Sequence, residues 1–179
     1  ALCLLAAFRS MAQSGMMLFL PLYVADVVGA NPVMVGATVM AMHLGGVIVS
    51  PIAGVVSDRI GRRPVVMAGM SASTIAIIAL TFIDSTSAFV IGVSILGFLL
   101  FGVRPVIQSW MMDIAPAQMR GSATSLLFGT QSLFSMAMPL IGGLIADTYG
   151  LSEVFYAIAA AMLLANSAIF LLPAADKSE

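Results

Sequence analysis

Six long apolar stretches, separated by short polar or Gly/Pro-containing turns, limit most strongly how this chain can fold. A helix rises about 1.5 Å per residue, so roughly 20 apolar residues cross a hydrocarbon core about 30 Å thick. Barrel strands of about 9–11 alternating residues would not be continuously apolar. The sequence therefore predicts an all-α, polytopic membrane protein with one six-helix bundle over residues 1–179. The expected spans are about 2–25, 34–56, 64–83, 88–111, 121–146 and 153–173.

Composition excludes an ordinary soluble domain. Charged residues make up 8% of the chain, against about 25% in typical soluble domains, and 61% of residues are apolar. The mean hydropathy is +1.11. The sequence contains no phosphate-binding loop, no catalytic constellation and no set of metal ligands. We therefore expect no enzyme activity, cofactor, metal or nucleic-acid partner; the expected partners are the lipid bilayer and a small-molecule substrate.

Basic residues predict the orientation, because Lys and Arg in short loops near span ends favour the cytoplasmic side. The second loop, the fourth loop and the tail carry basic residues, whereas the first, third and fifth loops carry only acidic ones. The basic residues are Arg59, Arg62, Arg63, Arg120 and Lys177, and the acidic ones are Asp26, Asp84, Asp147 and Glu153. We expect an integral protein of the plasma membrane, here a bacterial inner membrane, with both termini in the cytoplasm.

The second loop carries the most specific motif, Gly54-Val-Val-Ser-Asp58-Arg59-Ile-Gly61-Arg62-Arg63. It resembles, at all six defining positions, the signature that transporters of the major facilitator superfamily carry between the second and third helices of each six-helix half. An orientation role alone would explain the arginines but not the spacing of Gly54, Asp58 and Gly61. Gly54 would permit close helix approach, Gly61 a tight turn, and Asp58 could reach Arg62 if the segment is helical.

This resemblance implies a conformational gating motif at a cytoplasmic gate. Its members are Gly54, Asp58, Arg59, Gly61, Arg62, Arg63, Arg120 and, as an acid at the inner end of the fourth span, Asp113. Arg120 opens the fifth span in a segment, Pro116 to Ala123, that resembles the superfamily's loop after the fourth helix.

A third segment resembles part of a motif of proton-coupled antiporters in this superfamily. Pro139, Gly142 and Gly143 match the end of their glycine-proline motif and are expected to pack helices, but Met138 stands where that motif has glycine. The resemblance as a whole implies secondary active transport of a small organic solute by alternating access, and the partial motif suggests proton-coupled efflux.

The chain's ends suggest a fragment of a twelve-helix transporter. It begins with Ala1, without the basic lead-in of a signal peptide, and its short tail suits the second half of such a protein. We therefore expect a missing N-terminal six-helix half that contributes to a shared midplane site. Two alternatives are a self-contained six-span protein forming a homodimeric carrier or pore, and a non-transporting membrane scaffold.

Polar residues within the spans are candidates for a substrate or proton pathway. Arg9 and Gln13 share one helix face, and Arg9 either faces protein and substrate or snorkels to the interface. Arg104 and Gln108 repeat this spacing, and Arg104 is interpreted as structural, within snorkelling reach of the inner end. Gln131 could bind solute or hold helices together.

His43, the only histidine, lies near the middle of its span and could carry a coupling proton. No acid is evident at similar depth, so the sequence favours a neutral, hydrogen-bonded His43. Any coupling acid would then lie in the missing half. Ser132, Ser135 and Asn166 are interpreted as packing groups.

Overall fold

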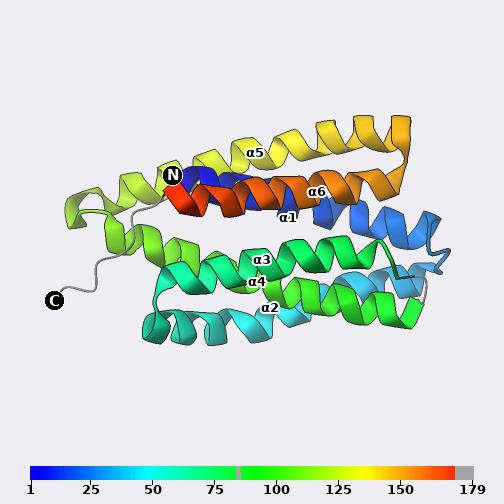
Figure 1. Cartoon of the computed structure of the whole chain (residues 1–179), viewed down its shortest axis with the longest axis horizontal. Helices are drawn as coiled ribbons and strands as arrows, with labels where there is room; N and C mark the ends of the chain where they lie inside the picture. Colours follow the sequence, from blue (N-terminus) through cyan, green and yellow to red (C-terminus); the bar gives the residue numbers. More distant parts are fainter. Residues whose placement is uncertain (84–85, 172–179) are drawn as a thin grey trace.

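The computed structural model describes residues 1–83 and 86–171, which form an all-α bundle (Figure 1). This confirms the predicted fold class. The helices are α1 (Leu2–Asp26), α2 (Pro32–Ile60), α3 (Arg62–Leu80), α4 (Thr86–Ile114), α5 (Arg120–Tyr149) and α6 (Leu151–Ser167), with short 3-10 turns at Ala117–Met119 and Ala168–Leu171. Five of the six are long and apolar enough to cross a membrane, and α6 is apolar but shorter, at 17 residues.

Helix ends differ from the predicted span ends where local hydrogen bonding overrides the apolar pattern. The predicted span 64–83 runs past the end of α3 at Leu80. After that, the N–H groups of Thr81, Phe82 and Ile83 bond to carbonyls three residues back, at 3.1, 3.1 and 3.4 Å, which tightens the chain into a turn. The last two residues of the predicted span 153–173 lie outside the described residues.

Two glycines make equivalent turns at opposite ends of the bundle. Gly61 joins α2 to α3 with φ 99° and ψ 154°, and Gly150 joins α5 to α6 with φ 102° and ψ 167°. Residues with a Cβ rarely adopt this conformation, so glycine lets one helix end and the next begin within a single residue. The tight turn predicted at Gly61 is confirmed.

The six helices form two three-helix units with the same packing pattern. α1 packs along α5 and α6, and α4 packs in the same way along α2 and α3, while α3 and α6 contact each other. α1 and α4 run in opposite directions in Figure 1. The two units thus share a packing pattern around antiparallel central helices, as expected for the inverted repeats of many transporters.

Glycines bring the paired helices close together. A Cβ at Gly45 on α2 would lie 2.8 Å from the Ser94 carbonyl oxygen on α4, and Gly97 on α4 faces the backbone of Met42. In the corresponding α1–α5 pair, Gly142 faces the ring of Phe19. These contacts leave no room for a side chain.

Within the part of the chain that the structure describes, no helix approaches Gly54 closely, so the close approach expected there stays a prediction. Nothing there lies within 4 Å of a Cβ built on Gly54. The neighbouring helix instead packs on the adjacent residue: a Cβ at Gly102 of α4 would lie 3.6 Å from Ala53. Successive helical residues point about 100° apart, so Gly54 faces away from α4.

Of the predicted packing motif on α5, only Gly142 packs tightly. Gly143 has no neighbour within 4 Å, and Pro139 is exposed.

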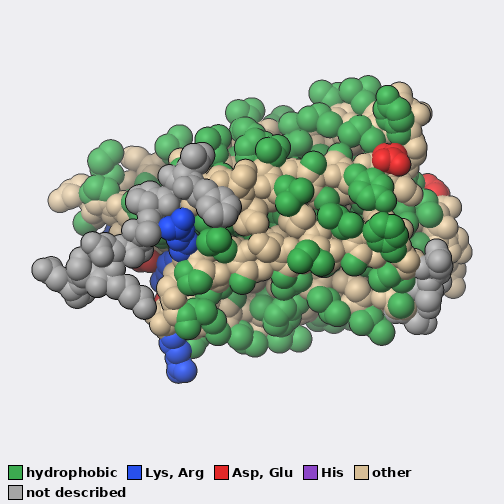
Figure 2. All heavy atoms as spheres, in the orientation of Figure 1, with side chains coloured by type: hydrophobic (Ala, Val, Ile, Leu, Met, Phe, Trp, Pro, Cys, Tyr) green, Lys and Arg blue, Asp and Glu red, His purple; other side chains and the backbone are tan. Residues whose placement is uncertain are grey.

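The surface suits a bilayer. Figure 2 shows hydrophobic side chains along the flank of the bundle, with the visible basic side chains at one end and the most prominent acidic ones at the other. Large hydrophobic side chains are exposed on every helix, and α2 and α5 are the least buried of the long ones. The α2–α3 and α4–α5 connections lie at the same end of the bundle (Figure 1).

Candidate functional site

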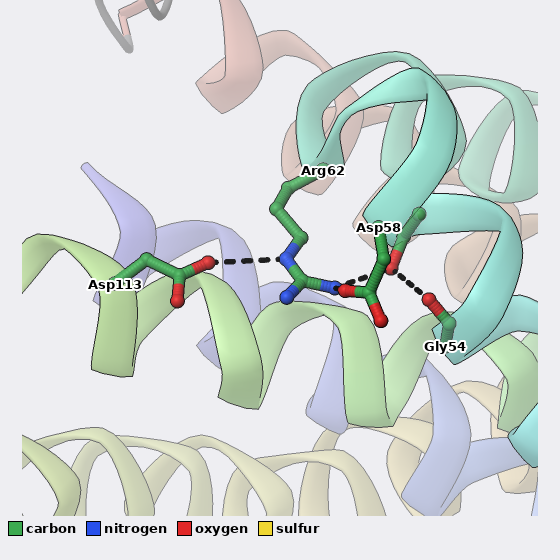
Figure 3. Close-up of polar contacts among 5 residues, drawn as sticks. Gly54, Asp58, Arg62 and Asp113 are labelled. Carbon is green, nitrogen blue, oxygen red and sulfur yellow. Dashed lines mark hydrogen bonds and ion pairs between the residues drawn. The ribbon is translucent and has the colours of Figure 1, made fainter. Parts of the chain in front are cut away.

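Arg62 holds together the ends of three helices. Its Nη1 lies 2.5 Å from Asp58 Oδ1 at the end of α2, and its Nε donates to Asp113 Oδ2 at the end of α4 at 3.1 Å. In Figure 3 the guanidinium of Arg62 lies between the two carboxylates. The structure therefore brings together the three charged groups that the family resemblance placed at a gate.

Ser57 completes this cluster and was missed by the sequence analysis. Its buried hydroxyl accepts a 2.6 Å hydrogen bond from Arg62 Nη1 and donates one of 2.8 Å to the Gly54 carbonyl oxygen. Through Ser57, Arg62 is thus hydrogen-bonded to the last turns of α2. The sequence shows a serine hydroxyl directly before Asp58. It does not show that this hydroxyl bonds to Arg62, because that contact depends on how the chain turns at Gly61.

The ion pair between Asp58 and Arg62 closes across a turn and not along one helix. α2 ends at Ile60 and α3 begins at Arg62, with Gly61 in a non-helical conformation between them. The helical segment assumed for this pair is therefore absent, and the backbone reversal at Gly61 brings the two charges together instead.

The cluster is accessible to water at one end of the bundle. The side chains of Arg62, Asp58 and Asp113 are 21%, 62% and 57% exposed. Ion pairs this exposed contribute about 0–1 kcal/mol each, because water and salt screen them. Such contacts break and re-form at low cost. Arg62 and Asp113 also line a hollow of about 420 Å³ between α4 and α5.

The other arginines of the gating motif do not join this cluster. Arg59 and Arg120 are exposed, and Arg63 is half-buried. The Nε atom of Arg63 is buried without a hydrogen-bond partner among the described residues. Arg120 is the first residue of α5, as the sequence predicted.

A second polar site lies inside the bundle, between α1, α4 and α5. Arg9 is 1% exposed, and its Nη1 donates to the Leu100 carbonyl oxygen of α4 at 3.0 Å. It therefore faces protein and does not snorkel to the interface. Gln13 and Gln131 are also buried. A pocket of about 250 Å³ is lined by Arg9, Ser10, Gln13, Ser14, Met17, Arg104, Gln131 and Ser135.

Serines in this region join helices. Ser10 Oγ lies 2.9 Å from Ser135 Oγ, and Ser14 Oγ donates to the Ser135 carbonyl oxygen at 3.1 Å, so both tie α1 to α5. Asn166 Nδ2 donates to Ser71 Oγ at 2.9 Å and ties α6 to α3. These contacts agree with the packing role expected for Ser135 and Asn166.

His43 lies apart from both polar sites. Its side chain is exposed on α2, its Nδ1 is 2.9 Å from the Val39 carbonyl oxygen, and its ring centroid is 5.4 Å from that of Phe101. It is hydrogen-bonded, as expected, but it does not line the pocket around Arg9. The structure thus separates His43 from the other pathway candidates.

Comparisons with known proteins agree in the kind of protein they find. The chain matches the Major Facilitator Superfamily over residues 2–179. It is 28% identical over 134 residues to the sialic acid transporter NanX of Escherichia coli (strain K12), covering 74% of this chain and 33% of that protein. It is 31% identical over 157 residues to the multidrug resistance protein MdtG of Rahnella sp. (strain Y9602), covering 86% of this chain and 38% of that protein.

Solved structures share the fold. The POT family transporter PepTSo superposes with a TM-score of 0.83 at 16% identity, over 99% of this chain and 39% of that one. A D-xylose-proton symporter superposes with a TM-score of 0.76 at 16% identity, over 98% of this chain and 47% of that one. The chain thus spans about a third to a half of the length of the proteins it resembles.

Proposed function

We propose that this chain, which belongs to the Major Facilitator Superfamily, forms one six-helix half of a secondary transporter that moves a small organic solute by alternating access. The chain is an integral membrane protein, and the relatives and fold neighbours that it matches are transporters, not enzymes. Because it spans less than half of these relatives, transport by the whole protein is part of the proposal.

The Arg62 cluster is the observation that carries this proposal. Alternating access needs contacts that hold one face closed and then release it, so the two states must differ by only a few kcal/mol. Arg62 connects the ends of α2, α3 and α4 through exposed ion pairs of about 0–1 kcal/mol each. Such weak ion pairs suit a latch, meaning a contact that holds the helix ends together at one membrane face in one state and releases them in the other.

The exposed faces of α2 and α5 support a second bundle as partner. These two helices are the least buried of the long ones, although both are long and apolar enough to cross a membrane. Gly54 on α2 has a clear face with nothing described within 4 Å, where a helix of another bundle could approach closely. We propose that the N-terminal six-helix half packs there and completes the substrate site.

The direction, coupling and location of transport belong to the same proposal. One relative is named a sialic acid transporter and another a multidrug resistance protein, which supports a small organic solute here. The partial antiporter motif supports proton-coupled efflux, the sorted charges support cytoplasmic termini, and the bacterial relatives support an inner membrane. Because His43 has only a backbone carbonyl and a ring as described partners, we assign the coupling acid to the other half.

Transport in liposomes tests the function. The full-length protein is reconstituted, and movement of sialic acid and of ethidium is followed with and without a proton gradient. We expect one of these solutes to move, and Arg62→Ala to slow it severalfold without loss of protein. The same assay on residues 1–179 alone should show no transport, and co-expression with the upstream half should restore it. Robust transport by residues 1–179 alone would favour a six-span homodimer.

Single cysteines test the orientation. In a Cys3-free background, Ser152→Cys in the acidic α5–α6 region should react with an impermeant thiol reagent added outside intact cells. Gln118→Cys, next to Arg120, should be protected until the cells are opened. The reverse pattern would invert the proposed topology and place the Arg62 cluster outside.

A further inference from the structure

We infer that the pocket between α1, α4 and α5 binds the carboxylate of an organic acid between Arg9 and Arg104, so that the transported solute is an organic anion. This inference rests on the proposed transport function and names its substrate class. It depends on three observations: how Arg9 is held, what charge surrounds it, and which groups line the pocket.

Arg9 has unused hydrogen-bonding capacity inside the bundle. A guanidinium carries five N–H donors. The described contacts of Arg9 include a single hydrogen bond, from Nη1 to the Leu100 carbonyl oxygen, and its Nε is buried without a partner. That carbonyl fixes the position of the guanidinium against α4 but does not neutralise its charge. A buried cation in this state is costly unless an anion reaches it.

The pocket brings a second cation to the same place. Arg104 lies on α4, one helical turn beyond Leu100, and lines the pocket with Arg9. No acidic residue lines this pocket, and neither arginine makes an ion pair with the part of the chain that is described. The described acids lie at helix ends or connections: Asp26, Asp58, Asp113, Asp147 and Glu153. The pocket is therefore electropositive and lies among helices long and apolar enough to cross a membrane.

The groups around the two arginines fit a carboxylate with a polar body. Guanidinium groups bind carboxylates through paired, charge-assisted hydrogen bonds. The buried amides of Gln13 and Gln131 can donate to and accept from hydroxyl or amide groups next to that carboxylate. The volume of about 250 Å³ holds the charged end of such a solute, and the rest would extend toward the other bundle.

An acidic side chain of the second bundle is the competing occupant, and the test separates the two. Met17, an exposed side chain on the pocket lining, is replaced by cysteine in the full-length transporter without other cysteines. Its modification rates are measured with anionic sulfonatoethyl and cationic trimethylammonioethyl methanethiosulfonate, each normalised to a free thiol. We expect the anionic reagent to react about tenfold faster or more, because two nearby cations attract it.

Variants assign this preference to the arginines. Arg104→Gln should reduce the rate ratio severalfold and Arg104→Lys should largely keep it, since lysine retains the charge. Arg9→Gln should also reduce it, and the exposed Arg104 keeps the test valid if the buried Arg9 variant fails to fold. Asp147→Asn, a charge change on an exposed side chain outside the pocket and the gating motif, is the control and should leave the ratio unchanged. A ratio near one, or a preference for the cationic reagent, means that the second bundle already supplies an acid and overturns the inference.

Protection experiments test carboxylate binding directly. Sodium acetate should slow modification of the Met17→Cys protein relative to sodium chloride of equal ionic strength, whereas acetamide should not. The protection should weaken about tenfold or more in Arg104→Gln, which loses a charge-assisted contact. Equal effects of acetate and acetamide would overturn the inference.

The transport assay separates this inference from the proposed function. Transport of sialic acid but not of its uncharged methyl ester supports both. Transport of ethidium, with no charge preference in the modification of Met17→Cys, would contradict the organic-anion inference and still support the proposed transport function. If the protein shows charge preference and acetate protection but moves no solute, the anion pocket is supported and the transport proposal is contradicted.

Discussion

Replacing Gly61 with alanine isolates the cost of the turn that joins α2 to α3. Gly61 has φ 99° and ψ 154°, a region that residues with a Cβ occupy only under strain of about 1–3 kcal/mol. The new methyl group meets no obstruction, because the nearest atom is Pro64 Cδ at 3.6 Å, an ordinary contact. The whole penalty is therefore conformational, and we expect Gly61→Ala to lower the free energy of unfolding by about 1–3 kcal/mol.

The measurement is chemical unfolding of the full-length protein in detergent, with two glycine controls. Gly150→Ala should cost the same amount, since its φ of 102° and ψ of 167° are nearly those of Gly61 and nothing lies within 4 Å of its Cβ position. Gly143→Ala should be neutral or stabilising by up to about 1 kcal/mol, because this glycine is inside α5 with free space around it.

The transport rates of the Gly61→Ala and Gly150→Ala variants should differ, although their losses of stability should be equal. Gly61→Ala also shifts Arg62 relative to Ser57 and Asp58, so it should slow transport beyond its effect on protein amount, whereas Gly150→Ala touches no ion pair in the described structure. A Gly61→Ala protein as stable as the unmodified one, or equal losses from Gly143→Ala, would refute the argument from backbone strain.

Two further predictions concern the latch and the helix contacts. A double-mutant cycle with Arg62→Gln and Asp113→Asn should show non-additive transport defects with a coupling of about 0.2–1 kcal/mol, since the 3.1 Å pair is exposed; additive defects would count against the pairing. Gly97→Ala should destabilise the protein by about 1–3 kcal/mol in detergent unfolding, because its methyl group would enter the backbone of Met42 and push α4 from α2. A neutral Gly97→Ala would mean that the two helices are less tightly packed than described.

The sequence alone determined the helices of this protein and much of the Arg62 cluster. Apolar length specifies membrane helices almost independently of their neighbours, because lipid requires each helix to satisfy its own backbone hydrogen bonds. Gly61 could be predicted at a tight turn because its role is local. The pairing of Arg62 with Asp58 and Asp113 was available through family resemblance, and the structure describes both contacts.

Only the tertiary structure decided which side chains meet across helices. Arg9 and Arg104 are 95 residues apart, and the sequence allowed each to snorkel. They line one pocket because α1 and α4 touch where Arg9 bonds to Leu100. The motif predicts a packing glycine at Gly54, but the rotation of α2 turns this residue away from α4. These facts depend on rotation about the helix axis and on packing. An apolar stretch specifies that a helix crosses the membrane, but polar contacts between helices depend on which face of each helix meets its neighbour.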